Sequence, residues 1–172
     1  MAASDPGRTG RAPRQDGAAR LIAAARRARR RSVSRFSGFA VGAALETQSG
    51  TIVTGCNIEN ATYGLTMCAE RVALFKALSD GHRAFRRIAI VADTAVPTPP
   101  CGACRQLLWE FAGDLEVIMG NLQQERARWP LRELIPLPFG AESITTAAER
   151  SGRAARRHPQ AGRASAGRSN RR

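Results

Sequence analysis

Two short cysteine-containing segments constrain this chain more than any other feature. The first is Cys68-Ala69-Glu70, and the second is Pro100-Cys101-Gly102-Ala103-Cys104. Together they supply three thiolates and one further carboxylate. Three protein ligands leave the fourth position of a tetrahedral zinc ion open, which distinguishes a catalytic site from a closed structural one. We therefore expect Cys68, Cys101 and Cys104 to bind one Zn²⁺ per chain and Glu70 to be the catalytic acid and base.

The spacing indicates where these residues lie. Cys101 and Cys104 are three residues apart, so they face the same way on the first turn of a helix, and Pro100 suits a helix start. Glu70 follows Cys68 by two residues and cannot share its direction on a regular helix. It reaches the metal only if Cys68 stands at the helix start. Three thiolates leave zinc with a net negative charge, and Arg71, adjacent to Glu70, is the candidate cation that offsets it.

A Cys-x-x-Cys pair alone is weak evidence, because redox pairs and structural zinc sites share it. A Cys-Ala-Glu element upstream of it is typical of zinc deaminases. The fourth cysteine, Cys56, follows a strand-like segment and is expected to be a buried small residue. Four cysteines without a signal peptide favour metal binding over disulfides, so we expect a cytoplasmic protein without a membrane span.

The net charge of +13 is concentrated at the two ends of the 172-residue chain. Residues 1–32 carry nine Arg and two Asp, residues 141–172 carry eight Arg and two Glu, and the middle has ten basic and ten acidic residues. We predict a disordered basic leader (1–15), one catalytic domain (16–142) and a disordered Arg-rich tail (143–172). The ends are either a solvated extension, which we favour, or a weak, nonspecific, salt-dependent ligand of nucleic acid.

The hydrophobic pattern predicts alternating helices and strands. Helices are expected at residues 16–31, 68–78 and 101–111, with a short turn at 131–135. Strands are expected at residues 39–45, 51–55, 87–92 and 115–119, the first two forming a hairpin. This order predicts a three-layer α/β/α sandwich with a partly parallel sheet.

Several ordered motifs now support a resemblance to the short, homotetrameric cytidine deaminases. The matching segments are residues 39–45 (FAVGAAL), 54–61 (TGCNIENA), 63–64 (YG), 68–71 (CAER), 100–106 (PCGACRQ) and 134–136 (LIP) with Phe139. Phe36 stands where that family usually has a tyrosine. The likeness covers roughly residues 16–140.

The resemblance implies a mixed five-stranded sheet, three zinc-binding cysteines, Glu70 as proton shuttle and a homotetramer with shared active sites. It implies that Asn57 and Glu59 hold the ribose hydroxyls, that Phe39 lines the base pocket and that Phe139 completes a neighbouring subunit's site. The full set of substrate-binding residues that it implies is Phe39, Asn57, Glu59, Asn60, Ala61, Tyr63, Ala69 and Phe139.

The function that we expect is zinc-dependent hydrolytic deamination of cytidine and 2′-deoxycytidine, with release of ammonia, in pyrimidine salvage. One alternative is another aminopyrimidine nucleoside such as blasticidin S, which the segment 57–60 (NIEN) disfavours. A second is a nucleic-acid-binding or editing deaminase that uses the basic ends, which the neutral middle and its lack of interleaved aromatics disfavour. A third is a structural zinc protein, but His82 and His158 lie in a turn and in the tail, so a fourth ligand is missing.

Overall fold

The computed structural model describes residues 16–140 of the chain. The chain divides into two compact units, Met1–Pro138 and Phe139–Arg172, and only Phe139 and Gly140 of the second unit are described. The predicted leader (1–15) and tail (143–172) lie outside the described residues. Each of the helices within residues 16–140 is too short or too polar to cross a bilayer.

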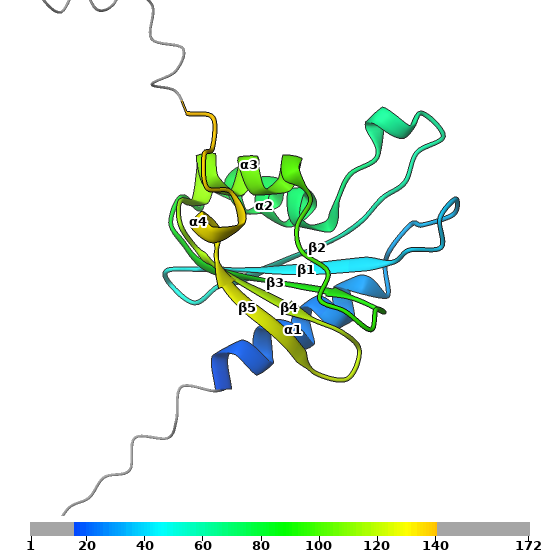
Figure 1. Ribbon diagram of the computed structural model, residues 1–172, viewed down its shortest axis with the longest axis horizontal. Helices are drawn as coiled ribbons and strands as arrows, with labels where there is room; N and C mark the ends of the chain where they lie inside the picture. Colours follow the sequence, from blue (N-terminus) through cyan, green and yellow to red (C-terminus); the bar gives the residue numbers. More distant parts are fainter. Residues whose placement is uncertain (1–15, 141–172) are drawn as a thin grey trace, which may run out of the picture. The chain divides into compact units, whose positions relative to one another are not determined.

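A five-stranded mixed sheet forms the centre of the first unit (Figure 1), in the order β2-β1-β3-β4-β5. Its strands are β1 (Val41–Thr47), β2 (Ile52–Cys56), β3 (Phe85–Ala92), β4 (Glu116–Gly120) and β5 (Glu125–Pro130). The central pair β3 and β4 is parallel, whereas the β1–β2, β1–β3 and β4–β5 pairs are antiparallel. The predicted mixed five-stranded sheet is confirmed.

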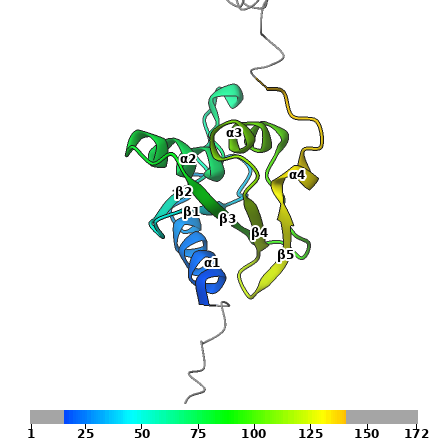
Figure 2. The same cartoon turned by 90° about the vertical axis from the view of Figure 1, so that its left-hand side faces the viewer.

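Helices cover both faces of this sheet (Figures 1 and 2). The first, α1 (Asp16–Arg29), lies on one face, and α2 (Ala69–Ser79) and α3 (Gly102–Ala112) lie on the other. Two shorter elements, η1 (Tyr63–Leu65) and α4 (Leu131–Leu134), complete the order. Each face has its own buried apolar cluster, with Leu21 of α1 in one and Leu74 and Leu108 of the other helices in the second. The three-layer sandwich is therefore confirmed.

Two glycines allow the helices to approach the strands closely. A Cβ atom on Gly42 would come within 2.1 Å of the Ala25 carbonyl oxygen in α1. A Cβ atom on Gly55 would come within 2.4 Å of the Ala69 carbonyl oxygen in α2. These contacts are too short for any side chain, so glycine at both positions sets the spacing of the layers. Through Gly55, the strand pair β1–β2 fixes the start of α2.

The expected elements are present, with small shifts at their ends. The two cysteine-bearing helices begin one residue later than predicted, at Ala69 and Gly102. The first strand begins at Val41 and not at Phe39, because the Val41 N–H donates to the Asn57 side chain just as the chain enters the sheet. The residue pattern did not predict β5, an exposed edge strand whose sequence ERARWP lacks the alternation of a half-buried strand.

Candidate active site

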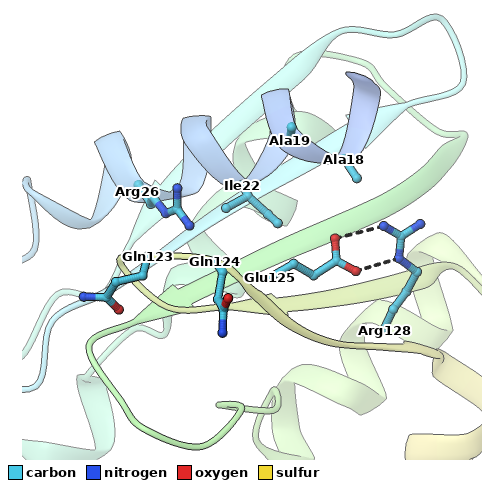
Figure 3. A pocket seen from close by; sticks show the side chains of 8 residues that line it. All are labelled: Ala18, Ala19, Ile22, Arg26, Gln123, Gln124, Glu125 and Arg128. Atoms are coloured by element: carbon cyan, nitrogen blue, oxygen red, sulfur yellow. Dashed lines mark hydrogen bonds and ion pairs between the residues drawn. The ribbon is translucent and has the colours of Figure 1, made fainter. Parts of the chain in front are cut away.

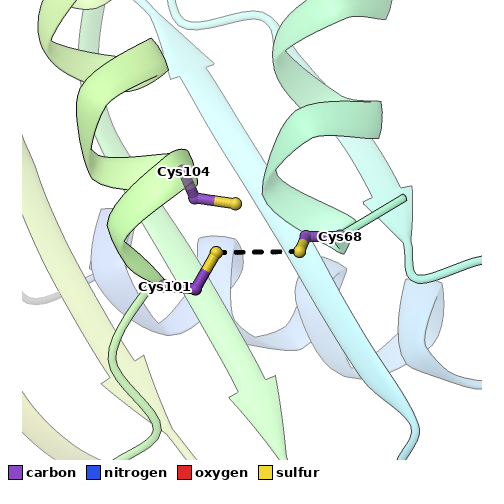
Figure 4. A group of neighbouring side chains, drawn as sticks. All are labelled: Cys68, Cys101 and Cys104. Atoms are coloured by element: carbon purple, nitrogen blue, oxygen red, sulfur yellow. Dashed lines mark hydrogen bonds between the residues drawn. The ribbon is translucent and has the colours of Figure 1, made fainter. Parts of the chain in front are cut away.

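Three cysteines from two helix starts form a cluster (Figure 4). Cys68 is the N-cap of α2, Cys101 is the N-cap of α3, and Cys104 lies in the first turn of α3. Their sulfur atoms all lie within 4.8 Å of one another, and the Cys68 and Cys101 Sγ atoms are 3.8 Å apart. Placing Cys68 at the helix start is the condition that the sequence set for Glu70 to reach the cluster.

The donor set fits a zinc ion. Four ligands at about 2.3 Å in a tetrahedron put neighbouring sulfurs about 3.8 Å apart, which is the Cys68–Cys101 separation. The cluster has three members among residues 16–140, with no fourth His, Cys, Asp or Glu in the group. A zinc ion held by these three sulfurs keeps one position for water or substrate, as catalytic sites do.

Glu70 lies in the first turn of α2 and is only 6% exposed. Burial, with the neighbouring Cys68 thiolate, raises the pKa of its carboxyl to about 7, while hydrogen bonds with its own backbone N–H and with Cys104 act in the opposite direction. A carboxyl in such surroundings can hold and release a proton near neutral pH. Its place beside the cluster, but outside the ligand set, suits a proton carrier.

The Cys68 thiol is acidified by its neighbours. A hydrogen bond from Cys104 and then one from Arg71 lower its pKa to about 5, against the opposing effect of burial. The Arg71 Nη2 atom lies 3.6 Å from the Cys68 Sγ and 2.7 Å from the Thr66 carbonyl oxygen. The guanidinium therefore contacts a sulfur of the cluster directly, which agrees with the proposed role of Arg71 in offsetting thiolate charge.

Two backbone hydrogen bonds join the beginning and the end of the loop that precedes α2. Ile58 and Met67 exchange two backbone hydrogen bonds of 2.9 Å, and Ile58 also bridges Val33. Met67 directly precedes Cys68, so this antiparallel bridge sets Asn57 beside Cys68 and Glu59 beside Thr66. The segment that carries the expected sugar-binding residues thereby runs alongside the segment that leads into Cys68.

Asn57 is 8% exposed, and its amide is held from three sides. Its Oδ1 accepts hydrogen bonds from the Ser32 hydroxyl at 2.6 Å and the Val41 N–H at 2.8 Å. Its Nδ2 donates to the Phe39 carbonyl at 2.8 Å. These contacts fix which end of the amide carries the N–H groups, so one further N–H is left in a defined direction.

Glu59 binds the segment that contains Phe36 and Ser37. Its carboxylate accepts hydrogen bonds from the Phe36 N–H at 2.7 Å, the Ser37 N–H at 3.2 Å and the Ser37 hydroxyl. The Ser37 hydroxyl and the Phe36 N–H hold the pKa of Glu59 below its usual range. A charged carboxylate with remaining lone pairs can also accept a hydrogen bond from a sugar hydroxyl.

A cavity of about 430 Å³ opens at this carboxylate. It is lined by Phe36, Ser37, Glu59, Tyr63 and Thr66. Phe36 and Tyr63 meet edge to face with their ring centroids 6.1 Å apart, and Tyr63 is 75% exposed. This volume is in the range of small-molecule sites, and its mixture of aromatic and polar groups suits a nucleoside.

The remaining predicted substrate residues have different surroundings. Phe39 is exposed, and its backbone is bound to Ser37 and Asn57. Asn60 and Ala61 lie on the exposed loop, where the Asn60 Oδ1 accepts from the Thr62 N–H. Ala69 is fully buried, and Phe139, 59% exposed, belongs to the second compact unit.

The sequence did not single out Ser32, Ser37 and Thr66. Ser32 and Ser37 hold the two predicted sugar-binding side chains, and the Thr66 carbonyl accepts from Arg71. The roles of Ser32 and Ser37 depend on contacts across 25 and 22 positions, and Thr66 acts through its backbone carbonyl, so no local pattern marks them. Only the polar character of the loops was visible beforehand.

A larger cavity, of about 660 Å³, lies elsewhere (Figure 3). It is bounded by α1 and the start of β5, and Arg26, Glu125 and Arg128 are among its walls. Glu125 and Arg128 pair with each other there, and Arg26 donates to the Asn121 carbonyl. Its walls include none of the clustered thiols and none of the predicted substrate residues, whereas the 430 Å³ cavity is lined by Glu59 and Tyr63. We therefore place the active site at the cysteine cluster and the loop that leads to it.

The fold and the cluster define a zinc-binding α/β protein with an open, carboxylate-flanked metal position. Residues 16–121 match the family model described as the cytidine and deoxycytidylate deaminase zinc-binding region. The chain therefore belongs to this family.

Comparison with individual proteins agrees with this family assignment. The chain is 47% identical over 131 residues to a cytidine deaminase of Sporosarcina psychrophila, covering 76% of this chain and 96% of that one. A cytidine deaminase of Halalkalibacterium halodurans is 50% identical over 125 residues, covering 72% and 95%. The crystal structure of a Burkholderia pseudomallei cytidine deaminase superposes with a TM-score of 0.68 at 46% identity, covering 70% and 98%. A Bacillus cereus blasticidin-S deaminase is more distant, at 33% identity over 107 residues.

Proposed function

We propose that this protein deaminates cytidine and 2′-deoxycytidine by hydrolysis, giving uridine or 2′-deoxyuridine and ammonia. The observation that carries the proposal is the buried Glu70 carboxyl beside a three-sulfur cluster that leaves one metal position open. The relatives of highest identity given above are cytidine deaminases and agree with it.

In the proposed mechanism the cysteines bind the metal and Glu70 transfers protons. Cys68, Cys101 and Cys104 would hold the zinc ion, which when bound supplies the Lewis acidity that lets water attack at neutral pH. Glu70 takes a proton from the attacking water and delivers it to N3 of the base as the C4–O bond forms. It then carries the second proton to the exocyclic nitrogen, so that ammonia leaves and C4 becomes a carbonyl.

The loop residues orient the nucleoside. Asn57 has one amide N–H beyond the one that it donates to Phe39, and Glu59 has a carboxylate; together they match a hydroxyl that both donates and accepts. We assign them to the ribose hydroxyls, within a binding stretch that runs through Asn60 and Ala61 to Tyr63. Phe39 and Ala69 belong to the same substrate set by their motif positions. This pair disfavours blasticidin S, whose deaminase is also the more distant relative.

We further propose a homotetramer with shared active sites. The 430 Å³ cavity is lined by the exposed side chains of Phe36 and Tyr63, and Leu65, two residues after Tyr63, is exposed too. Exposed apolar side chains at this cavity suit its closure by another chain. By family likeness Phe139 would complete a neighbour's site. The reduced thiols that the metal site needs fit a cytoplasmic enzyme of pyrimidine salvage.

The test is an ultraviolet assay of the purified, zinc-loaded chain on cytidine, 2′-deoxycytidine, cytosine and cytidine monophosphate. We expect turnover of the two nucleosides and little turnover of the free base, which lacks the sugar that Asn57 and Glu59 would bind. Equal turnover of cytosine and cytidine would contradict the sugar assignment. Zinc bound without turnover of any of the four would contradict the proposed activity. Light scattering on the same sample measures the oligomeric state.

A further inference from the structure

The net charge of the described residues comes from one helix and the turn that follows it. Residues 33–140 carry ten basic and ten acidic side chains, whereas residues 16–32 carry six Arg and one Asp. Two of these arginines have internal roles, because Arg26 donates to the Asn121 carbonyl and Arg29 donates to the Ala40 carbonyl. The other four, Arg20, Arg27, Arg30 and Arg31, are exposed.

These four side chains form what we name the basic face of α1. Within residues 16–140 their guanidinium groups have no ion pair and no hydrogen bond. Arg20 and Arg27 are two helical turns apart, and Arg31 follows one turn later, where its N–H still bonds back to the Ala28 carbonyl. Arg20, Arg27 and Arg31 therefore form a row of charge about 16 Å long, and Arg30 lies to one side of it.

The requirements of the helix itself account for only part of this row. The helix dipole favours basic side chains only near the C-terminus, which accounts for Arg26, Arg27 and Arg29 in the last turn of α1 but not for Arg20. Like charges one turn apart, such as Arg27 and Arg31, repel and destabilise a helix. A row that keeps them without internal partners fits a surface that meets an external polyanion.

We propose that the basic face of α1 binds the phosphate backbone of a nucleic-acid duplex. Phosphates recur about every 3.4 Å along each strand of a duplex, so a straight row of guanidinium groups finds partners without a fixed register. The sequence of α1 contains no aromatic residue. Stacking platforms for the bases of a single strand are therefore missing from this face, which favours a duplex.

The position of the face is compatible with catalysis. It lies on the side of the sheet opposite to α2 and α3, whose starts carry the cysteine cluster (Figures 1 and 2). Binding there recognises backbone charge and no base sequence. The surface would hold the enzyme on a nucleic acid while the nucleoside site stays accessible.

The test compares two triple variants of the full chain that lose the same charge. Arg20→Gln, Arg27→Gln and Arg31→Gln are combined in the first. The control combines Lys76→Gln, Arg83→Gln and Arg132→Gln, which are exposed and lie on α2, the loop after it and α4. Unlike the arginines of the basic face, these three contact the Thr54 carbonyl, the Leu78 carbonyl and Asp114. The probe is a DNA duplex of about 20 base pairs, titrated at several salt concentrations.

We expect the first triple to weaken duplex binding at least tenfold and to lower the slope of log K against log salt by about 2.7, while the control changes the slope by less than 1. Both triples should keep their zinc and their deaminase activity, which shows that the fold is intact. The first triple should also keep its melting temperature, whereas the control, which loses an ion pair and several hydrogen bonds, should melt at a lower temperature. An equal loss in the two triples would overturn the proposal, because charge alone would then explain binding. The proposal would also be overturned if the first triple bound the duplex as tightly as the unaltered chain does. The separated strands and anionic lipid vesicles are titrated in the same way, and tighter binding to the separated strands, or a loss of binding seen only with the vesicles, would overturn it as well.

Discussion

The two sides of the active site are built in different ways. The metal side consists of the starts of α2 and α3, where Cys68, Cys101 and Cys104 are placed by regular helix geometry. The loop side consists of residues 32–39 and 57–67, where side chains bind the backbone of segments far away in sequence. We infer that the metal side sets the rate of the chemical step and the loop side sets nucleoside affinity. Changes on the first should lower kcat, and changes on the second should raise or lower KM.

Glu70→Gln should have the largest effect. The amide keeps the size of the side chain but cannot carry a proton between water and base, so kcat should fall by about 100- to 10,000-fold. Zinc content should stay at one per chain, because Glu70 is not one of the three clustered ligands. The measurement is steady-state kinetics together with metal analysis. Glu110→Gln, which removes an exposed carboxylate from α3, is the control, and near-normal kcat in Glu70→Gln would remove the proposed proton carrier.

Arg71→Gln should have the next largest effect. It removes the cation 3.6 Å from the Cys68 sulfur, so the sulfur becomes more electron-rich and the metal a weaker Lewis acid. We expect kcat to fall by about 10- to 100-fold with zinc retained and KM little changed. Lys76→Gln is the control, because it removes a cation from the same helix away from the cluster. A change in KM alone would show that Arg71 acts on nucleoside affinity, and the assignment of the metal side to the chemical step would then be wrong for this residue.

Part of the metal side was predictable from sequence because helix geometry places Cys101 and Cys104 on one turn. That Cys68 joins them across 33 positions was predicted by the zinc deaminase pattern and not by local geometry. The loop side was predictable only by family likeness. Nothing in the sequence near Asn57 indicates that Ser32 would fix its amide, because a contact across 25 positions depends on the finished fold. The edge strand β5 was missed for a related reason, since its exposed charged residues have no pattern and only pairing with β4 defines it.

Ser32→Ala should have a smaller effect, confined to affinity. Loss of the hydroxyl removes one of the two hydrogen bonds to the Asn57 Oδ1 and leaves the amide less well fixed. We expect KM for cytidine to rise by roughly 5- to 10-fold, the equivalent of about one hydrogen bond, with kcat unchanged. Ser32→Thr should restore KM, because it keeps the hydroxyl.

Ser34→Ala is the matched control, since this serine lies in the same segment and its hydroxyl makes no hydrogen bond among the described residues. A rise in KM for Ser34→Ala equal to that for Ser32→Ala would show that the segment responds to any substitution. Ser32 would then have no specific positioning role.

Phe36→Tyr should have the smallest effect, and it tests the loop side by adding a group. Phe36 is exposed, lines the cavity at Glu59 and packs edge to face on Tyr63, so a phenol oxygen can point to water or to the sugar without being buried. A hydrogen bond in so open a place exchanges with water, and we expect KM to fall by about twofold with kcat and zinc content unchanged. Phe111→Tyr is the control, because it adds the same hydroxyl at an exposed position on α3. A fall in kcat for Phe36→Tyr would show that this part of the loop acts on the chemical step. The assignment of the loop side to affinity alone would then be wrong for Phe36 and Tyr63.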